Sequence, residues 1–94
     1  MHYISKKTSE LTESEKQELL SIFNKIFKRT RNIDELIDQY ISNVFGYSFH
    51  ILVKNESRII GHAAYVPAYY LINGKRMLLV DGVDGFIIKE YRDG

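Results

Sequence analysis

The sequence predicts an α+β domain in which a first strand and two helices precede an antiparallel meander. Two segments near the N-terminus begin with helix-capping signals and continue with apolar residues at helical spacing. From residue 49 onward the apolar residues recur at every second position, which is the period of a strand. An Asn-Gly pair then separates two apolar runs and indicates a tight hairpin.

The first half of the chain contains the predicted helices. Residues 3–7 can form a short strand ahead of them. The first helix is expected to begin at the capping box at 12–15 and to continue to about Lys28, and the second to run from a similar box at 32–35 to Gly46. Each helix has one apolar face, so we expect both to lie on the sheet.

The second half of the chain contains the predicted meander. Its strands are expected at residues 49–54, 58–66, 69–72, 75–80 and 83–88. Residues 55–57 form the first turn, and Pro67 is expected to end the strand that precedes it. Asn73 and Gly74 form the tightest turn, because both residue types tolerate a positive φ.

Composition excludes several classes of protein. With 94 residues the chain is one domain at most, or part of one. Its formal net charge is +1 and its basic residues are scattered, so we expect no binding to nucleic acid. The one basic cluster follows the first helix and is expected to face solvent and complement the helix dipole. Its members are Lys25, Lys28, Arg29 and Arg31.

The chain carries no cysteine and no targeting signal that can be recognised. Without cysteine there is no disulfide framework, no thiolate nucleophile and no cysteine-based zinc site. The N-terminus lacks the apolar core of a signal peptide. The longest apolar region, 59–72, is interrupted by Gly61, His62 and Pro67 and is too short to span a bilayer. We therefore expect a soluble, cytoplasmic protein without a membrane partner.

Three segments together resemble a known family. Residues 58–67 read RIIGHAAYVP, residues 80–85 read VDGVDG, and residues 91–94 read YRDG. With the hairpin between them, they resemble the GNAT superfamily of acyl-CoA-dependent N-acyltransferases, most closely the aminoglycoside 2'-N-acetyltransferase branch. The resemblance covers roughly residues 15–92. It implies that residues 1–94 form a single, incomplete domain, the N-terminal half of a GNAT fold.

The resemblance also implies a reaction and the residues that carry it. Enzymes of this family transfer an acetyl group from acetyl-CoA, the acyl donor, to an amine, here a small molecule. Asp84 matches the acidic residue of the donor-binding strand and would take a proton from the amine, directly or through water. Gly85, Phe86 and Ile87 match the positions whose backbone pairs with the pantetheine arm. Arg92 matches the start of the loop that holds the pyrophosphate.

The sequence departs from the family pattern at its end. Lys89 and Glu90 replace the usual turn that contains proline, and no residue follows Gly94. The pyrophosphate loop and its helix cannot be identified in these residues. We therefore expect the 94-residue chain by itself to bind acetyl-CoA weakly and to be inactive, although the family is one of enzymes.

The residues of the last strand also have simpler interpretations. Asp81 and Asp84, which alternate with glycines, can serve only to shape a β-bulge. Gly85 can be an ordinary weak point in a strand instead of a place where a ligand approaches. From the residues alone, the functional and the structural interpretations both remain open.

Histidines and tyrosines of the sheet are interpreted as structural residues. His62 has apolar neighbours on its face and is expected to be a hydrogen-bonded core residue. No third ligand accompanies it and His50, so we expect no metal site. Tyr65, Tyr69 and Tyr70 can line an acceptor pocket, but packing between helix and sheet is the favoured interpretation.

A second function belongs to a different class. The half-fold can act as a non-catalytic binding or assembly module that uses the open edge of its sheet. Residues 83–88 would leave backbone donors and apolar side chains unpaired at that edge. On this basis we expect the chain to self-associate as a homo-oligomer through this strand.

Overall fold

The computed structural model describes residues 2–91 of the chain. A strand and two helices precede three long strands, and short 3-10 turns follow the first and last strands. The elements are β1 (His2–Lys7), η1 (Thr8–Glu10), α1 (Glu13–Ile26), α2 (Ile33–Ile41), β2 (Phe49–Asn55), β3 (Arg58–Ile72), β4 (Lys75–Ile87) and η2 (Lys89–Tyr91). The predicted α+β class and the predicted order of elements are confirmed.

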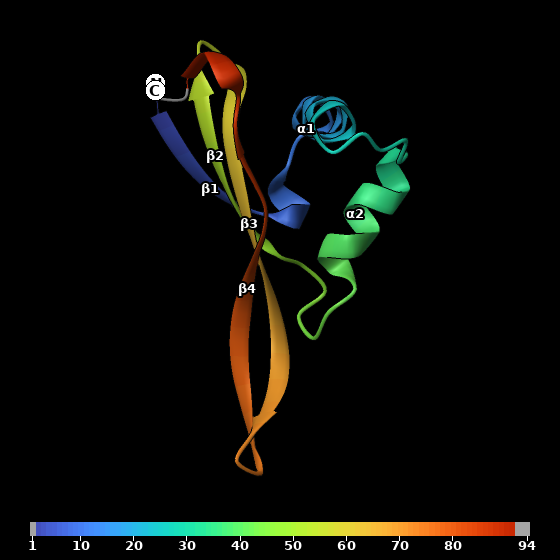
Figure 1. Ribbon diagram of the computed structural model, residues 1–94, viewed down its shortest axis with the longest axis vertical. Helices are drawn as coiled ribbons and strands as arrows, with labels where there is room; N and C mark the ends of the chain where they lie inside the picture. The colour runs from blue at the N-terminus through green and yellow to red at the C-terminus, as the bar shows by residue number, and fades with distance from the viewer. Residues whose placement is uncertain (1, 92–94) are drawn as a thin grey trace.

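The four strands form one antiparallel sheet in the order β1–β2–β3–β4. Each strand pairs with the next along the chain, which is the expected meander. Both helices lie on the same side of the sheet (Figure 1). A sheet covered on one face buries alternate residues, and β2 shows this pattern, because His50 and Leu52 are buried while the residues that flank them are more exposed.

Both predicted capping boxes are present at the helix starts. In α1 the Thr12 hydroxyl accepts a hydrogen bond from the Glu15 N–H at 3.1 Å, and the Glu15 carboxylate accepts one from the Thr12 N–H at 2.8 Å. Asn32 and Glu35 make the same pair of bonds at 2.9 and 3.0 Å in α2. These bonds satisfy N–H groups that have no partner inside a helix.

Both helices are shorter than predicted. The first ends at Ile26, and the second ends at Ile41 instead of continuing to Gly46. The Asn43 amide donates to the backbone carbonyls of Tyr40 at 2.8 Å and Tyr47 at 2.9 Å, so a side chain replaces the next turn of α2. No helix within residues 2–91 has the length and apolar character that are needed to cross a membrane.

The hydrophobic core lies between the helices and the sheet. Its buried residues are Leu11, Leu19, Phe23, Leu36, Tyr40, Leu52, Ile59 and Ala64. The Phe23 ring of α1 is fully buried and packs edge-on against His62 of β3 and Phe86 of β4, at centroid distances of 5.2 and 5.4 Å. Phe23 therefore joins α1 to the last two strands of the sheet.

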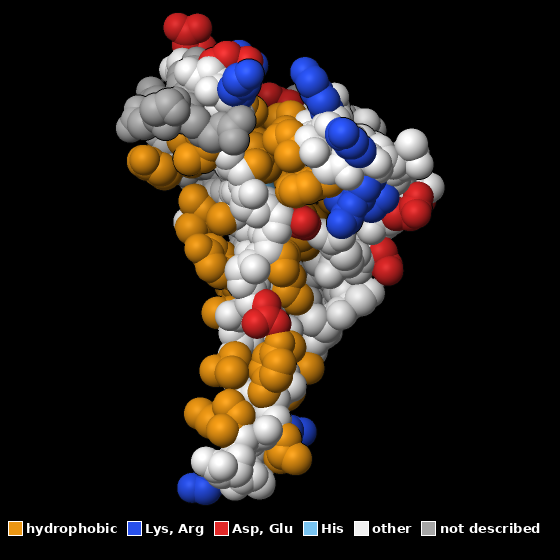
Figure 2. All heavy atoms as spheres, viewed as in Figure 1, with side chains coloured by type: hydrophobic (Ala, Val, Ile, Leu, Met, Phe, Trp, Pro, Cys, Tyr) orange, Lys and Arg blue, Asp and Glu red, His pale blue; other side chains and the backbone are white. Residues whose placement is uncertain are grey.

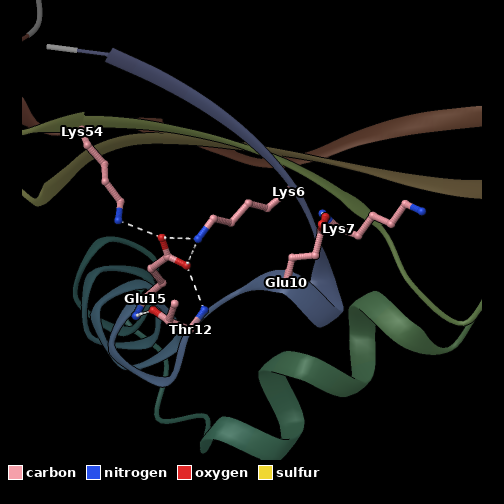
Figure 3. A network of polar contacts seen from close by, with 6 residues as sticks. All are labelled: Lys6, Lys7, Glu10, Thr12, Glu15 and Lys54. Atoms are coloured by element: carbon pink, nitrogen blue, oxygen red, sulfur yellow. Dashed lines mark hydrogen bonds and ion pairs between the residues drawn. The ribbon is translucent and has the colours of Figure 1, made fainter.

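A buried carboxylate joins the start of α1 to the first two strands (Figure 3). Glu15 accepts from the Lys6 ammonium at 2.7 and 2.9 Å and from the Lys54 ammonium at 2.7 Å, in addition to the Thr12 N–H. Burial alone would raise the pKa of Glu15, but the hydrogen bonds from Lys54, Lys6 and Thr12 outweigh it and lower the pKa to about 2. The carboxylate therefore stays charged.

Strand β3 does not stop at Pro67, as the sequence predicted, but continues to Ile72. The last pair between β2 and β3 is Phe49–Tyr65, so beyond it β3 is paired only with β4. Proline has no N–H to donate and is tolerated where a strand has a neighbour on one side only. The segments 75–80 and 83–88, predicted as two strands, likewise form one strand, β4, which ends at Ile87.

Beyond the last β2–β3 pair, β3 and β4 extend as a two-stranded hairpin, residues 66–81, which we call the arm. It projects away from the helices and contributes to the longest dimension of the molecule, 46 Å (Figure 1). Asn73 and Gly74 form its turn with φ of 51° and 76°, as predicted. Tyr69 and Tyr70 are exposed on the arm, so the prediction that they pack between helix and sheet is wrong.

Candidate functional site

Strand β4 contains a β-bulge at Asp84 and Gly85. The pairing of β3 with β4 shifts between His62 and Ala64, so that one residue of β3 faces two residues of β4. The backbone of Asp84 is left-handed, with φ of 52°, which is uncommon for a residue other than glycine. Bulges of this kind redirect a side chain. The structure therefore contains the β-bulge that was the structural interpretation of these residues. The catalytic role of Asp84 stays a prediction.

The Asp84 carboxylate turns toward α2. Its Oδ2 atom accepts hydrogen bonds from the Tyr40 hydroxyl at 2.7 Å and from the Gln39 amide. Burial raises the pKa of Tyr40, and the bond to Asp84 raises it further, so the phenol remains a donor. Within residues 2–91 both hydrogen bonds to this carboxylate go to Oδ2. Among these residues, neither donor contacts the other oxygen, Oδ1.

Arg31 reaches the same cluster from the segment between the helices. Its Nη1 donates to the Gln39 Oε1, and its guanidinium carbon lies 5.9 Å from the centroid of the Phe23 ring. Among the described residues, its Nε and Nη2 are buried without a hydrogen-bond partner. The prediction that Arg31 faces solvent is therefore wrong. The Asn24 side chain of α1 binds the backbone N–H and C=O of Arg31 at 3.2 and 3.0 Å and keeps this residue close to the helix.

A chain of buried polar groups lies behind the bulge. The His62 Nδ1 is 2.9 Å from the backbone oxygen of Asp84, and its Nε2 is 3.0 Å from the His50 Nδ1. The His50 Nε2 is 2.9 Å from the Thr8 hydroxyl, which accepts from the Ser48 N–H at 2.9 Å. Both histidines, Thr8 and Ser48 are buried. The prediction that His62 is a hydrogen-bonded core residue is confirmed.

One arrangement of protons satisfies this chain when both rings are neutral. A carbonyl only accepts, so the His62 Nδ1 carries the proton toward Asp84. The His62 Nε2 then accepts from the His50 Nδ1–H, and the His50 Nε2 accepts from the Thr8 hydroxyl. The other acceptor near this hydroxyl is the Ser48 carbonyl oxygen at 3.2 Å, which already accepts from the Thr8 N–H at 3.0 Å. Burial lowers the pKa of both histidines, and the proximity of His62 helps to lower that of His50 to about 4. Two neutral histidines therefore hold the carbonyl of the bulge in place.

A groove of about 730 Å³ lies between α1 and the end of β4. Gly85, Phe86 and Ile87, the residues predicted to pair with the acyl donor, all line it. Its volume is within the range of small-molecule sites. Its lining includes three basic residues and two acidic ones, namely Lys25, Arg58, Lys89, Glu18 and Glu90. Asp84 is not among its lining residues, because its carboxylate is held by α2.

Asp81, which the sequence offered only as part of a bulge, lies apart from this cluster. Asp81 is on the arm, where its carboxylate accepts a hydrogen bond from the exposed Tyr70 hydroxyl. Arg92 lies outside the described residues. Within residues 2–91 no group of three or more His, Asp or Glu side chains is arranged to hold a metal ion.

Sequence reasoning missed Tyr40 and Gln39, which bind the Asp84 carboxylate, and Arg31, which binds Gln39. The Tyr40 ring lies in the core. A buried tyrosine hydroxyl nevertheless needs a hydrogen-bond partner, and this requirement could have indicated a polar contact for Tyr40. Gln39 and Arg31 carried no such signal, because polar residues beside a helix usually face solvent.

Two comparisons with known proteins found no match. No model of a known protein family matches the chain, and no curated protein matches it. The relationship to the GNAT superfamily therefore stays a prediction, based on the sequence of residues 58–67, 80–85 and 91–94.

Proposed function

We propose that this chain is the N-terminal half of a GNAT-type N-acetyltransferase, in which the end of β4 binds acetyl-CoA and Asp84 serves the acceptor amine. The observation that carries the proposal is the bulge at Asp84 and Gly85. It turns a carboxylate toward the helices and places a glycine beside a groove, both on the last strand of the sheet. Acyl transfer to an amine requires a base and a site for an extended donor.

The backbone around Gly85 suits a donor that binds as an extra strand. A Cβ atom added at Gly85 would meet only the His62 carbonyl oxygen, at 3.8 Å. The fold therefore has room for a side chain there, and the glycine leaves the strand open to close approach by a ligand. A pantetheine arm can pair with such an edge through main-chain hydrogen bonds, with Phe86 and Ile87 beside it.

Asp84 is held in a position where it can accept a proton. An amine must be deprotonated before it attacks a thioester, and a carboxylate can take the proton directly or through one water. Tyr40 and Gln39 fix the Oδ2 atom, which leaves Oδ1 for the amine. Acetyl-CoA supplies the acetyl group. As the new N–C bond forms the C–S bond breaks, the nitrogen loses a proton, and the departing thiolate takes up a proton in its place.

A non-catalytic binding or assembly module is the second candidate. The arm favours it, because the arm exposes apolar side chains beyond the part of the sheet that the helices cover. Such a module would need neither the Asp84 carboxylate nor an open backbone at Gly85. The two candidates therefore differ in whether acetyl-CoA binds at the end of β4.

Titration calorimetry with acetyl-CoA distinguishes them. We expect the 94-residue chain to bind with a Kd near ~1 mM, since the predicted pyrophosphate loop is absent from it. Gly85→Ala should abolish this binding without unfolding the protein, whereas Gly82→Ala, which adds a methyl group at another exposed glycine of β4, should retain it. If Gly85→Ala binds as well as the original chain, the donor does not bind along this strand.

Asp84→Asn tests the second half of the proposal. The change keeps the shape of the side chain and removes its charge. In a form of the protein that turns over, we expect a large loss of kcat at neutral pH with little change in acetyl-CoA affinity. The loss should shrink at high pH, where the amine is already deprotonated. Unchanged turnover at neutral pH would limit Asp84 to shaping the bulge.

A further inference from the structure

The arm exposes an unusual amount of apolar surface for so small a protein. Its large hydrophobic residues that are more than a third exposed are Tyr69, Tyr70, Leu71, Ile72, Met77, Leu78, Leu79 and Val80. Figure 2 shows hydrophobic side chains along the arm nearly to its tip. They lie on both strands of the arm, and exposed apolar side chains that gather in one region often mark a contact surface.

The arm also has an unpaired edge. Within the described residues, β4 pairs with β3 alone, so the outer N–H and C=O groups of residues 75–81 face away from the sheet. An isolated two-stranded hairpin is only marginally stable in water. A long apolar edge is a template for pairing with another strand. The arm therefore combines an open edge with side chains that favour burial.

The charges of the arm indicate which strand fits this edge. Its only charged residues are Lys75 and Arg76 beside the turn and Asp81 at the base. Side chains alternate between faces along a strand, so Lys75 and Asp81 lie on one face of β4, at opposite ends of the arm. A second β4 that runs antiparallel would bring the basic tip of each copy to the acidic base of the other.

We propose that two copies of this chain pair through the β4 edges of their arms, antiparallel about a two-fold axis at Leu78. In this register Leu78 faces Leu78 of the second copy, and Met77 faces Leu79 of the second copy. Lys75 then faces Asp81 of the second copy, and the symmetry forms this ion pair twice. The two four-stranded sheets become one continuous sheet.

Face and symmetry select this register. Residues that lie directly opposite in an antiparallel pair share a face of the sheet, and a shift by one residue moves every side chain to the other face. Placing Arg76 opposite Asp81 would break this rule, because these residues point to opposite faces. Pairing about Leu78 keeps this rule, and it places opposite charges across from each other and apolar side chains across from apolar side chains.

In this pairing the β4 residues of the two arms contact each other directly, whereas the β3 residues of each arm lie one strand away from the contact. An interface between identical copies must be complementary to itself, which the Lys75 and Asp81 arrangement provides. The pairing uses residues 75–81 and leaves the bulge and the groove outside the contact.

A single introduced cysteine tests the register. The chain has no cysteine, so Leu78→Cys adds one thiol per copy at the proposed axis. Opposite Cβ atoms in an antiparallel pair are about 4.5–5.5 Å apart, close to disulfide geometry. We expect rapid oxidation to a covalent dimer. Leu71→Cys, an exposed site of the arm on β3, should cross-link at least tenfold more slowly. Equal rates would overturn the register.

Charge reversal tests the partner. In analytical ultracentrifugation we expect the original chain and the control Glu56→Lys, at the exposed turn between β2 and β3, to be dimers. Asp81→Lys and Lys75→Asp should each weaken the dimer at least tenfold, and their equimolar mixture should restore it as a heterodimer. A monomeric original chain at all concentrations, or a mixture that fails to restore pairing, would overturn the proposal.

Discussion

The body of the molecule and its arm use the same two strands in opposite ways. In the body, β3 and β4 lie under the helices, and Phe23, His62 and Phe86 pack together in or beside the core. In the arm, the same strands continue without helices, and most of their large apolar side chains are exposed. The comparison shows that β3 and β4 pack against the core at one end and expose apolar side chains at the other.

Polar groups follow the same division. The body buries the Glu15 carboxylate, which is paired with two lysines, and two neutral histidines that are hydrogen-bonded to each other. In the arm, by contrast, Asp81 accepts an exposed hydrogen bond from the Tyr70 hydroxyl, and this bond raises the pKa of the phenol. The bulge at Asp84 and Gly85 lies where the two regions meet. The proposed donor site therefore lies at the border between the body and the arm.

Truncation of a core residue should show the largest difference between the regions. We expect Phe23→Ala to lower the free energy of unfolding by about 3–5 kcal/mol, because it removes a fully buried ring. The matched change Leu79→Ala on the arm should cost less than about 1 kcal/mol in the monomer. Urea unfolding at low protein concentration measures both. Similar losses for the two variants would contradict the division into body and arm.

Acid should destabilise the body through its histidine pair. Below its ordinary pKa of 6.5, His50 in the unfolded chain takes up a proton, whereas in the fold its pKa is about 4. The free energy of unfolding should therefore be greatest above about pH 6.5 and fall by about 3 kcal/mol as the pH approaches 4. The lowered pKa of His62 acts in the same direction.

Urea titrations between about pH 4.5 and 7.5 measure this effect, in a range where Glu15 remains charged. The variant His2→Gln, at the exposed start of β1, serves as the control and should keep the full pH dependence. Unfolding free energies that do not change over this range would show that the buried pair is not held neutral.

Two glycines of the sheet should respond differently to alanine. A Cβ atom at Gly61 would meet the Val53 side chain at 3.3 Å and the Phe86 carbonyl oxygen at 3.4 Å, whereas at Gly85 the nearest atom is at 3.8 Å. We expect Gly61→Ala to cost about 1–3 kcal/mol and Gly85→Ala less than about 0.5 kcal/mol. Thermal unfolding measures both, and a large loss for Gly85→Ala would assign that glycine to the fold instead of to a ligand.

The smallest expected effect concerns the two hairpin turns. The turn of the body places Glu56 and Ser57 at φ of 54° and 71°, whereas the turn of the arm uses Asn73 and Gly74. Ser57→Gly should therefore stabilise the protein by up to about 1 kcal/mol, since it relieves a left-handed residue. The unfolding midpoint measures this gain. A loss of stability would mean that the Ser57 side chain contributes more than its backbone costs.

Sequence patterns predicted most of this fold, because its elements are determined locally. Capping boxes determine where the helices begin, and the period of the strands, together with Asn73 and Gly74, determines the hairpin. The continuous strand through Pro67 could not be predicted in the same way. It depends on β2 ending at the pair Phe49–Tyr65, which leaves the missing proline N–H without consequence.

The candidate site was predictable only in part. Asp84 and Gly85 stood out by their alternation with Asp81 and Gly82, and the structure does bulge there. The contacts of Asp84 with Tyr40 and Gln39 connect residues 44 and 45 positions apart. Contacts of this range depend on how α2 packs against the sheet, which is decided by the core as a whole.

The most direct test of the account is to locate acetyl-CoA on the 94-residue chain by NMR. We predict that a titration into the millimolar range shifts the backbone amide signals of Gly85, Phe86 and Ile87 together with those of Lys25 in the groove. Signals of the arm tip at Asn73 and Gly74 should not move. Shifts at the tip without shifts at the end of β4, or no shifts at all, would contradict the claim that this strand binds the acyl donor.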